Sequence, residues 1–163
     1  MTTRVTTGGL SSAALAAEAA SVVLAAFDLG AAVRLGCDLV ARALDDGTPI
    51  VVEVDHGERL AFRAALPGSL PDSDHWIAGK RRVVRRFARS SLAVRVSFEE
   101  RGTTFAAATG LTEPEYAAHG GGVPVVVAGV GVVGGLYVSG LPQVEDHALC
   151  IAALRAMSAM PRS

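Results

Sequence analysis

His119 is the histidine best placed for binding chemistry in this chain. It lies three residues after Tyr116 and directly before the run Gly120, Gly121 and Gly122. Because glycine has no side chain, such a backbone can approach a flat ligand closely, and the neighbouring imidazole can offer it a ring nitrogen. The pattern therefore predicts a ligand site at these five residues. The alternative is that His119 caps a short preceding helix by bonding its last carbonyl groups.

Lys80 is the only lysine in the chain, and it falls at the centre of an otherwise apolar helical arc. A helical wheel for residues 74–89 gives this arc as Trp76, Ile77, Val83, Val84 and Phe87. Burying an ammonium group without a partner is unfavourable, so Lys80 should meet a carboxylate, backbone carbonyls or an anionic ligand. One interpretation is a structural ion pair across a subunit contact, or a stem that reaches out to water. The other interpretation is that the ammonium of Lys80 binds an anionic ligand.

Arginines form a dense stripe on the opposite face of the same predicted helix. They are Arg81, Arg82, Arg85, Arg86 and Arg89. Such a stripe could bind an acidic protein partner, or it could pair with acids of a neighbouring subunit. No aromatic side chains alternate with these arginines, as a nucleic-acid platform would require.

The composition limits the classes of function that are open to the chain. With 163 residues it has the length of one domain, and a formal net charge of −1 gives no overall field for nucleic acid or an anionic membrane. Charged residues make up 19% of the chain, below the roughly 25% of typical domains, so we expect a homo-oligomer that buries part of its surface.

The cysteines and the N-terminal segment argue against a secreted protein. Cys37 and Cys150 form no CxxC pair or zinc-type cluster, which argues against a disulfide scaffold or a structural metal. Residues 13–27 are apolar, but Glu18 interrupts them and only Arg4 precedes them, so an alanine-rich helix is favoured over a signal peptide. We therefore expect a cytoplasmic protein without a membrane span.

The periodicity of the chain predicts the elements that must position these residues. Helices are expected at residues 13–27, 29–44, 74–88 and 142–157, with hairpins at 50–65 and 123–139. Residues 113–119 suggest one or two helical turns. Residues 90–110 are ambiguous, because Ser90 could cap a helix through Glu100 whereas Leu92, Val94 and Val96 alternate as in a strand.

The order of these elements predicts an α/β (α+β) fold, with an antiparallel sheet of hairpins flanked by helices. A single domain is expected over residues 11–158, after a flexible N-terminus at 1–10. The predicted helix at residues 29–44 has two faces. Arg34, Asp38, Arg42 and Asp45 form a charged row, and the other side carries Leu29, Val33, Gly36, Val40 and Leu44.

Motifs in the last third of the chain resemble those of the haem-degrading domain family, which includes GlcG-like proteins and the C-terminal domain of PduO-type proteins. They are GGGVPVVV at residues 120–127, GVVGGLYVSG at 131–140 and Asp146 at the start of a helix. Upstream, residues 64–68, 74–77 and 90–92, with Lys80 and Phe87, resemble a short, functionally uncharacterised branch of this family.

This resemblance implies about five antiparallel strands, assembly into oligomers and, in some relatives, binding of haem or a corrinoid. The leading hypothesis is thus an oligomeric small-molecule binder whose ligand is haem or a related tetrapyrrole. His119 would be the axial ligand of the iron, beside Tyr116 and the run Gly120, Gly121 and Gly122, and Lys80 would meet the ligand's carboxylates. An adaptor without cofactor is the alternative. An oxidative haem-degrading enzyme is the third hypothesis, and whether any reaction is catalysed stays open.

Overall fold

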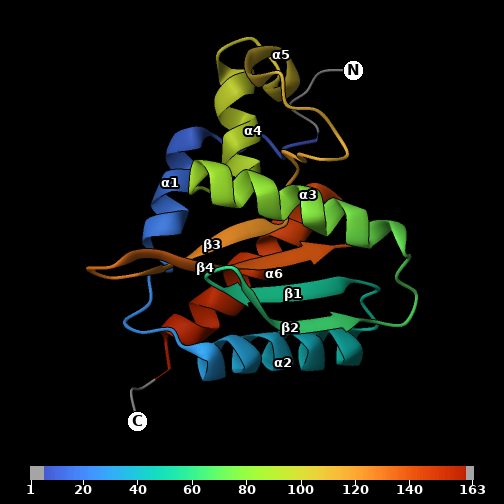
Figure 1. Cartoon of the computed structure of the whole chain (residues 1–163), viewed down its shortest axis with the longest axis vertical. Coiled ribbons are helices and arrows are strands. Elements are labelled where there is room, and N and C mark those ends of the chain that lie inside the picture. Colours follow the sequence, from blue (N-terminus) through green and yellow to red (C-terminus); the bar gives the residue numbers. More distant parts are fainter. Residues whose placement is uncertain (1–5, 161–163) are drawn as a thin grey trace.

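The computed structural model describes residues 6–160 and contains six helices and four strands within them (Figure 1). The helices are α1 (Ser12–Ala20), α2 (Leu29–Asp46), α3 (Asp72–Phe87), α4 (Ser91–Glu100), α5 (Phe105–Thr109) and α6 (Gln143–Ser158). The strands are β1 (Val51–His56), β2 (Arg59–Ala65), β3 (Gly122–Val127) and β4 (Gly131–Ser139).

The four strands form one antiparallel sheet in the order β2-β1-β4-β3. Both predicted hairpins are present, and the central strands β1 and β4 join them, with Val51 opposite Ser139. The prediction of about five strands was slightly too high. Leu24 forms only an isolated bridge to Val127, so the edge beside β3 gains one bridge and not a fifth strand.

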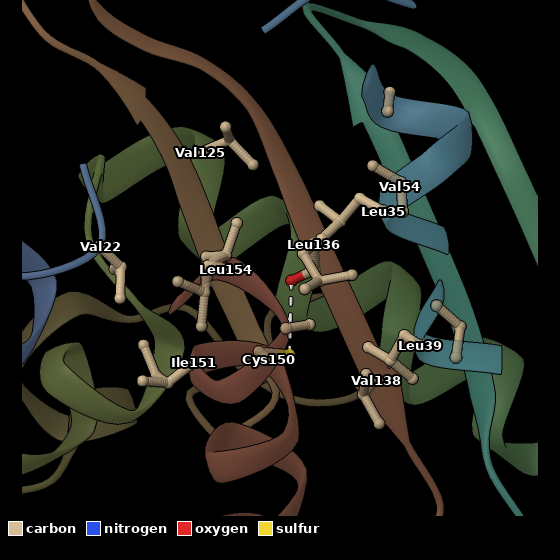
Figure 2. Packing of buried hydrophobic residues seen from close by; sticks show 14 of the residues in the cluster. Val22, Leu35, Leu39, Val54, Val125, Leu136, Val138, Cys150, Ile151 and Leu154 are labelled. Atoms are coloured by element: carbon tan, nitrogen blue, oxygen red, sulfur yellow. Dashed lines mark hydrogen bonds between the residues drawn. The ribbon is translucent and has the colours of Figure 1, made fainter. Parts of the chain in front are cut away.

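Helices α2 and α6 cover one face of the sheet, and the main hydrophobic core lies between them and the strands. Figure 2 shows how Leu35 and Leu39 of α2 and Ile151 and Leu154 of α6 meet the side chains of the sheet. Cys150 is fully buried there, and its thiol lies 3.8 Å from the carbonyl oxygen of Leu136. It serves as a packing residue.

Helix α3 crosses the opposite face of the sheet (Figure 1). Ile77 and Val84 pack there against Val51 and Tyr137. The predicted apolar arc is thus confirmed for these two residues, and Lys80 lies between them, only 3% exposed. The sheet is therefore covered on both faces.

The apolar side of the predicted two-faced helix is not the side that α2 buries. Its buried face carries mostly small residues and two leucines: Ala31, Ala32, Leu35, Gly36, Leu39 and Ala43. Leu29, Val33 and Leu44 are exposed instead. Gly36 explains the orientation, since a Cβ added there would lie 2.2 Å from the ring of Phe62, so only glycine permits this close packing on β2.

The ambiguous region at residues 90–110 is helical. Ser90 caps α4, accepting a hydrogen bond from the amide of Ala93. The alternating apolar residues were misleading because α4 is buried on two sides. Leu92 and Val96 pack toward α1, whereas Val94 packs into a second cluster with residues of α3 and α5.

Two further expectations about local structure need correction. Residues 113–119 form turns and not a helix. The predicted helix at residues 13–27 is shorter, because α1 spans only Ser12–Ala20, and the chain continues as an extended segment that includes Leu24. Of the N-terminal segment 1–10, residues 6–9 form a turn and Leu10 packs beside α4, while residues 1–5 lie outside the described part.

Candidate functional site

The sequence-predicted residues His119 and Lys80 both line one cavity of about 340 Å³. It lies between α3 and the start of α6, where β4 ends. Most of its lining side chains are polar. Those used below are Ser73, Trp76, Lys80, His119, Ser139, Gln143 and Asp146.

His119 lies in the loop that precedes β3, and two neighbours hold its ring. Its Nε2 atom is hydrogen-bonded to the carboxylate of Glu113. The ring of Trp76 meets it edge-on, with 5.0 Å between the ring centres. Burial lowers the pKa of His119 below its usual value, outweighing the opposite effect of Glu113. The imidazole is therefore neutral at pH 7. It is not a helix cap, because the last helix before it, α5, ends at Thr109.

Lys80 is engaged in an ion pair inside its own chain. Its Nζ atom donates to the carbonyl oxygen of Val138 at 2.9 Å and to Oδ2 of Asp146 at 3.3 Å. Burial lowers the pKa of Lys80 and raises that of Asp146. One interpretation of the sequence was an ion pair across a subunit contact, whereas the partner, Asp146, lies on α6 of the same chain. An ammonium has three donors, so one N–H of Lys80 remains without a partner among the described residues.

The glycine run at residues 120–122 packs closely against α6 and Lys80. A Cβ at Gly120 would lie 2.2 Å from the carbonyl oxygen of Gln143, and one at Gly121 would lie 2.7 Å from Nζ of Lys80. Gly121 also has φ +120°, which disfavours any side chain. These glycines are required because α6 and Lys80 approach the backbone here.

Tyr116 is not brought to the His119 cavity. It lines a separate cavity with residues of α4 and α5, and the guanidinium of Arg86 lies over its ring at 5.7 Å. Sequence reasoning in turn missed Glu113, Ser139 and Gln143 as members of the site. Of these three, only Ser139 could have been recognised from the sequence, because it belongs to the Val-Ser-Gly motif at the end of β4.

The arginine stripe of α3 is divided between internal and outward-facing residues. Arg81 pairs with the buried Glu53, and Arg85 pairs with the buried Asp55 at 2.9 Å. Arg82 donates to the backbone of Glu115. Two of the five arginines thus neutralise acids of β1, which leaves less of the stripe for an acidic protein partner.

Burial also changes the pKa of an acid of β1 that faces α3. It raises the pKa of Asp55, although the carboxylate accepts hydrogen bonds from Arg85 and from the hydroxyl of Tyr137. One of its oxygens, Oδ1, is buried without a hydrogen-bond partner. Among the described residues, these side chains form an ion-pair network enclosed between α3 and the sheet. The network holds α3 against the sheet.

A second, more apolar cavity of about 250 Å³ lies beside α1. His147 of α6 forms one side of it and bonds through Nε2 to the carboxylate of Glu18 at 2.6 Å. His147 is only 3% exposed, so it is a packed, hydrogen-bonded histidine. The histidine of the larger cavity, His119, is the more accessible of the two.

Within residues 6–160, no group of three or more histidine, cysteine, aspartate or glutamate side chains is placed to hold a metal ion. In the same part of the chain, no helix combines the length and apolar character that a membrane span requires.

The fold and its buried ionic cluster define a single-domain α+β protein with an open antiparallel sheet. The chain belongs to the family described as haem degrading protein HbpS-like, whose model matches residues 27–155. This confirms the family resemblance that the C-terminal motifs carried.

Relatives of similar length occur in two Streptomyces species. A UPF0303 protein of Streptomyces avermitilis is 46% identical over 149 residues, which cover 91% of each chain. One from Streptomyces coelicolor is 52% identical over 120 residues, which cover 74% of this chain and 76% of the relative.

Solved structures share the fold. The Ybr137w protein superposes with a TM-score of 0.82 at 25% identity, covering 95% of this chain and 91% of its own. HbpS gives a TM-score of 0.63 at 21% identity, covering 82% and 91%. A complex of PduOC with haem gives 0.63 at 19% identity, covering 76% and 88%.

Proposed function

We propose that the protein binds a small molecule at His119, and that this ligand is haem or a related tetrapyrrole. The observation that carries the proposal is the state of the imidazole. It is neutral, its side chain is 27% exposed at a cavity, and Glu113 occupies its Nε2 atom. Histidines that ligate metals commonly hold a carboxylate at their second nitrogen. Nδ1 is the nitrogen that remains for iron.

The chemistry of the cavity also suits the carboxylate groups of such a ligand. Lys80 has an N–H that is free to donate within the described part of the chain. Ser73 and Ser139 line the same cavity with hydroxyl groups. A volume of about 340 Å³ lies at the lower end of the roughly 300–1,000 Å³ range of ligand pockets, so it can enclose one edge of a tetrapyrrole and not the whole ring.

The family supports the same ligand. The matching family model is described as a haem degrading protein, and a structural neighbour was solved as a complex with haem. Bound iron would supply redox chemistry, whereas the residues of this chain would hold and orient the ligand. His119 would provide the axial nitrogen and Lys80 a donor for a carboxylate.

A haemin titration of the purified protein, followed through the Soret band, tests this proposal. We expect saturable binding that His119→Ala weakens at least tenfold. The matched control is His75→Ala. It removes an exposed histidine in the first turn of α3, outside the residues that line the cavity, and should leave binding unchanged.

Loss of binding in both histidine variants, or in neither, would contradict the assignment of His119. Saturable binding that depends on His119 would justify adding a reductant and following the Soret band for breakdown of the macrocycle. That experiment addresses the enzymatic hypothesis separately.

A second candidate function is the binding of a compact carboxylate inside the cavity, and the polar lining favours it. Titration calorimetry with a short dicarboxylate such as succinate tests it. Binding that is lost in Ser139→Ala and unaffected by His119→Ala would favour this function over tetrapyrrole binding, since Ser139 lines the cavity with a hydroxyl group.

A further inference from the structure

The cavity of about 250 Å³ beside α1 lies between two buried apolar clusters of the chain. Val22, Val123 and Ile151 on its lining belong to the main core. Leu15 and Ala93, which also line it, belong to the smaller cluster between α1 and α4. Protein interiors are close-packed, with few voids larger than a water molecule. A space of this size between two packed clusters therefore suits a ligand with an apolar body.

Helix α1, which lies beside α4, forms one wall of this cavity (Figure 1). Few side chains attach this helix to the rest of the chain. Leu15 is its one buried residue. Glu18 bonds to His147, and the amide of Ser12 donates to the carboxylate of Glu100 at 2.8 Å. A helix of nine residues is marginal on its own in water. The attachment of α1 is thus the weakest part of the cavity wall, which gives a ligand a way in.

The edge of β3 that lines the cavity is unsuited to pairing with an added peptide strand. The amide of Gly122 donates to the hydroxyl of Ser91, and the carbonyl of Val126 accepts from Leu24. Pro124 lies midway between these two strand residues, so its backbone faces the same side, and it has no N–H. Peptides that extend a sheet bind through main-chain hydrogen bonds. The occupant that fits this cavity is therefore a small molecule.

The polar groups on the lining differ in whether they have partners. Glu18 and His147 bond to each other, and the hydroxyl of Ser90 caps α4. Arg89 is absent from the ion pairs formed among residues 6–160, and Glu100 attracts it only at longer range. The described lining thus combines apolar walls with a guanidinium that is free to pair with an anion.

Arg89 reaches this cavity because α3 ends before it. The sequence placed Arg89 on the arginine stripe of the helix, whereas α3 ends at Phe87. Ala88 follows with a φ of +52°, a left-handed conformation that is uncommon for a residue other than glycine. It turns the chain out of the helix, and both Ala88 and Arg89 line the cavity. Residues in such strained conformations cluster at ligand sites.

We propose that this cavity binds a small monocarboxylate with a compact apolar body, such as a medium-chain fatty acid. The carboxylate pairs with Arg89, and the hydrocarbon lies against Leu15, Val22 and Ile151. Arginine can bind a carboxylate through two parallel N–H···O bonds, and burial of the hydrocarbon adds affinity. The volume of about 250 Å³ is below the roughly 300–1,000 Å³ of most ligand pockets, so the ligand must be compact.

This site is independent of the proposed tetrapyrrole site. Among the described residues, the cavity beside α1 and the cavity at His119 share no lining side chain. Failure of haem binding would therefore leave the binding of a monocarboxylate beside α1 intact, and the reverse also holds.

Titration calorimetry of the full chain with octanoate tests the proposal. The wild type should bind octanoate saturably, and Arg89→Gln should weaken binding about tenfold or more, because a charge-assisted contact is lost. Arg86→Gln is the matched control, since Arg86 lies over the ring of Tyr116 and outside the cavity lining. A wild type without saturable binding, or equal losses in the two variants, would overturn the proposal.

Octanol separates the role of the carboxylate from that of the hydrocarbon. It should bind the wild type more weakly than octanoate does, and Arg89→Gln should leave its binding unchanged. Octanol that binds as tightly as octanoate would show that the cavity takes an uncharged apolar ligand, and would overturn the assignment of Arg89.

A pair of alanines in α1 tests the position of the hydrocarbon. Ala19 lines the cavity, whereas Ala17 is exposed on the same helix and is not among the lining residues. Ala19→Phe should fill the space and abolish octanoate binding, and Ala17→Phe should leave it unchanged. Thermal unfolding of both variants checks that they are folded. Octanoate binding that survives in a folded Ala19→Phe variant would place the ligand elsewhere and contradict the proposal.

Discussion

Helices α2 and α3 cover opposite faces of the same sheet, and they differ in which residues they bury. Helix α3 buries a charged residue, whereas α2 exposes large apolar ones. Helix α3 buries Lys80 and directs Arg81 and Arg85 to acids of its own chain. Helix α2 buries small residues and leaves Val33 and Leu44 in contact with solvent. Amphipathic periodicity is present in both helices, yet it identifies the buried face correctly only in α3.

This difference shows that the face a helix buries depends on the side chains that the sheet presents to it. Strand β1 presents Glu53 and Asp55 toward α3, so a face with cations is the complementary one. Toward α2, Phe62 of β2 occupies the space beside Gly36, so a face of small residues fits better than one of large residues. Predictions that separate the two helices follow from these contacts.

The largest expected effect is at Lys80. Lys80→Met leaves Asp146 buried without its cation, and breaking a buried pair in this way destabilises proteins by about 3–5 kcal/mol. Chemical denaturation measures the free energy of unfolding. The double variant Lys80→Met with Asp146→Asn removes the uncompensated charge and should recover part of the loss. A stable single variant would show that the pair is not structural.

A matched pair of leucines in α2 tests the orientation of that helix. Leu39 is 4% exposed and Leu44 is 53% exposed. Leu39→Ala should therefore lower the free energy of unfolding by about 2–5 kcal/mol. Leu44→Ala should change it by less than about 0.5 kcal/mol. Equal losses in the two variants would mean that α2 is rotated relative to this description.

The arginine stripe of α3 allows a similar comparison with a smaller effect. Arg85→Gln leaves the buried carboxylate of Asp55 without its cation and should lower stability by about 1–3 kcal/mol. Arg86→Gln removes only the contact with the ring of Tyr116 and should lower it by less than about 1 kcal/mol. Denaturation curves under one set of conditions give both values, and a larger loss for Arg86→Gln would reverse the assignment of inner and outer arginines.

The smallest expected effect is a shift in pH dependence. Burial lowers the pKa of His119, so its imidazole becomes protonated only at a lower pH than that of an exposed histidine. Since only the neutral ring ligates iron, haem affinity should persist through pH 6.5 and fall at lower pH. Glu113 raises this pKa, so Glu113→Gln should move the midpoint lower still. Haemin titrations at a series of pH values measure the midpoint, and one above pH 6.5 in the wild type would contradict this.

Local patterns in the sequence were sufficient for much of the fold. The two hairpins, the cap at Ser90 and the central position of Lys80 in an apolar arc are all present in the structure. The alternation of Leu92, Val94 and Val96 did not separate strand from helix, because α4 is buried on two sides and its apolar residues do not keep to one helical face.

The candidate site was predictable only in part. The sequence identified His119 and Lys80, and both line one cavity. It could not assign Asp146 to Lys80 or Glu113 to His119, and it grouped Tyr116 with a cavity to which it does not belong.

The sequence by itself determined that Lys80 needs a partner if it is buried, since the need of an ammonium for a partner is a property of that group. Only the tertiary structure decided which residue is the partner. Lys80 and Asp146 are 66 residues apart, and no local pattern encodes which distant carboxylate the packing of α3 and α6 brings to that ammonium.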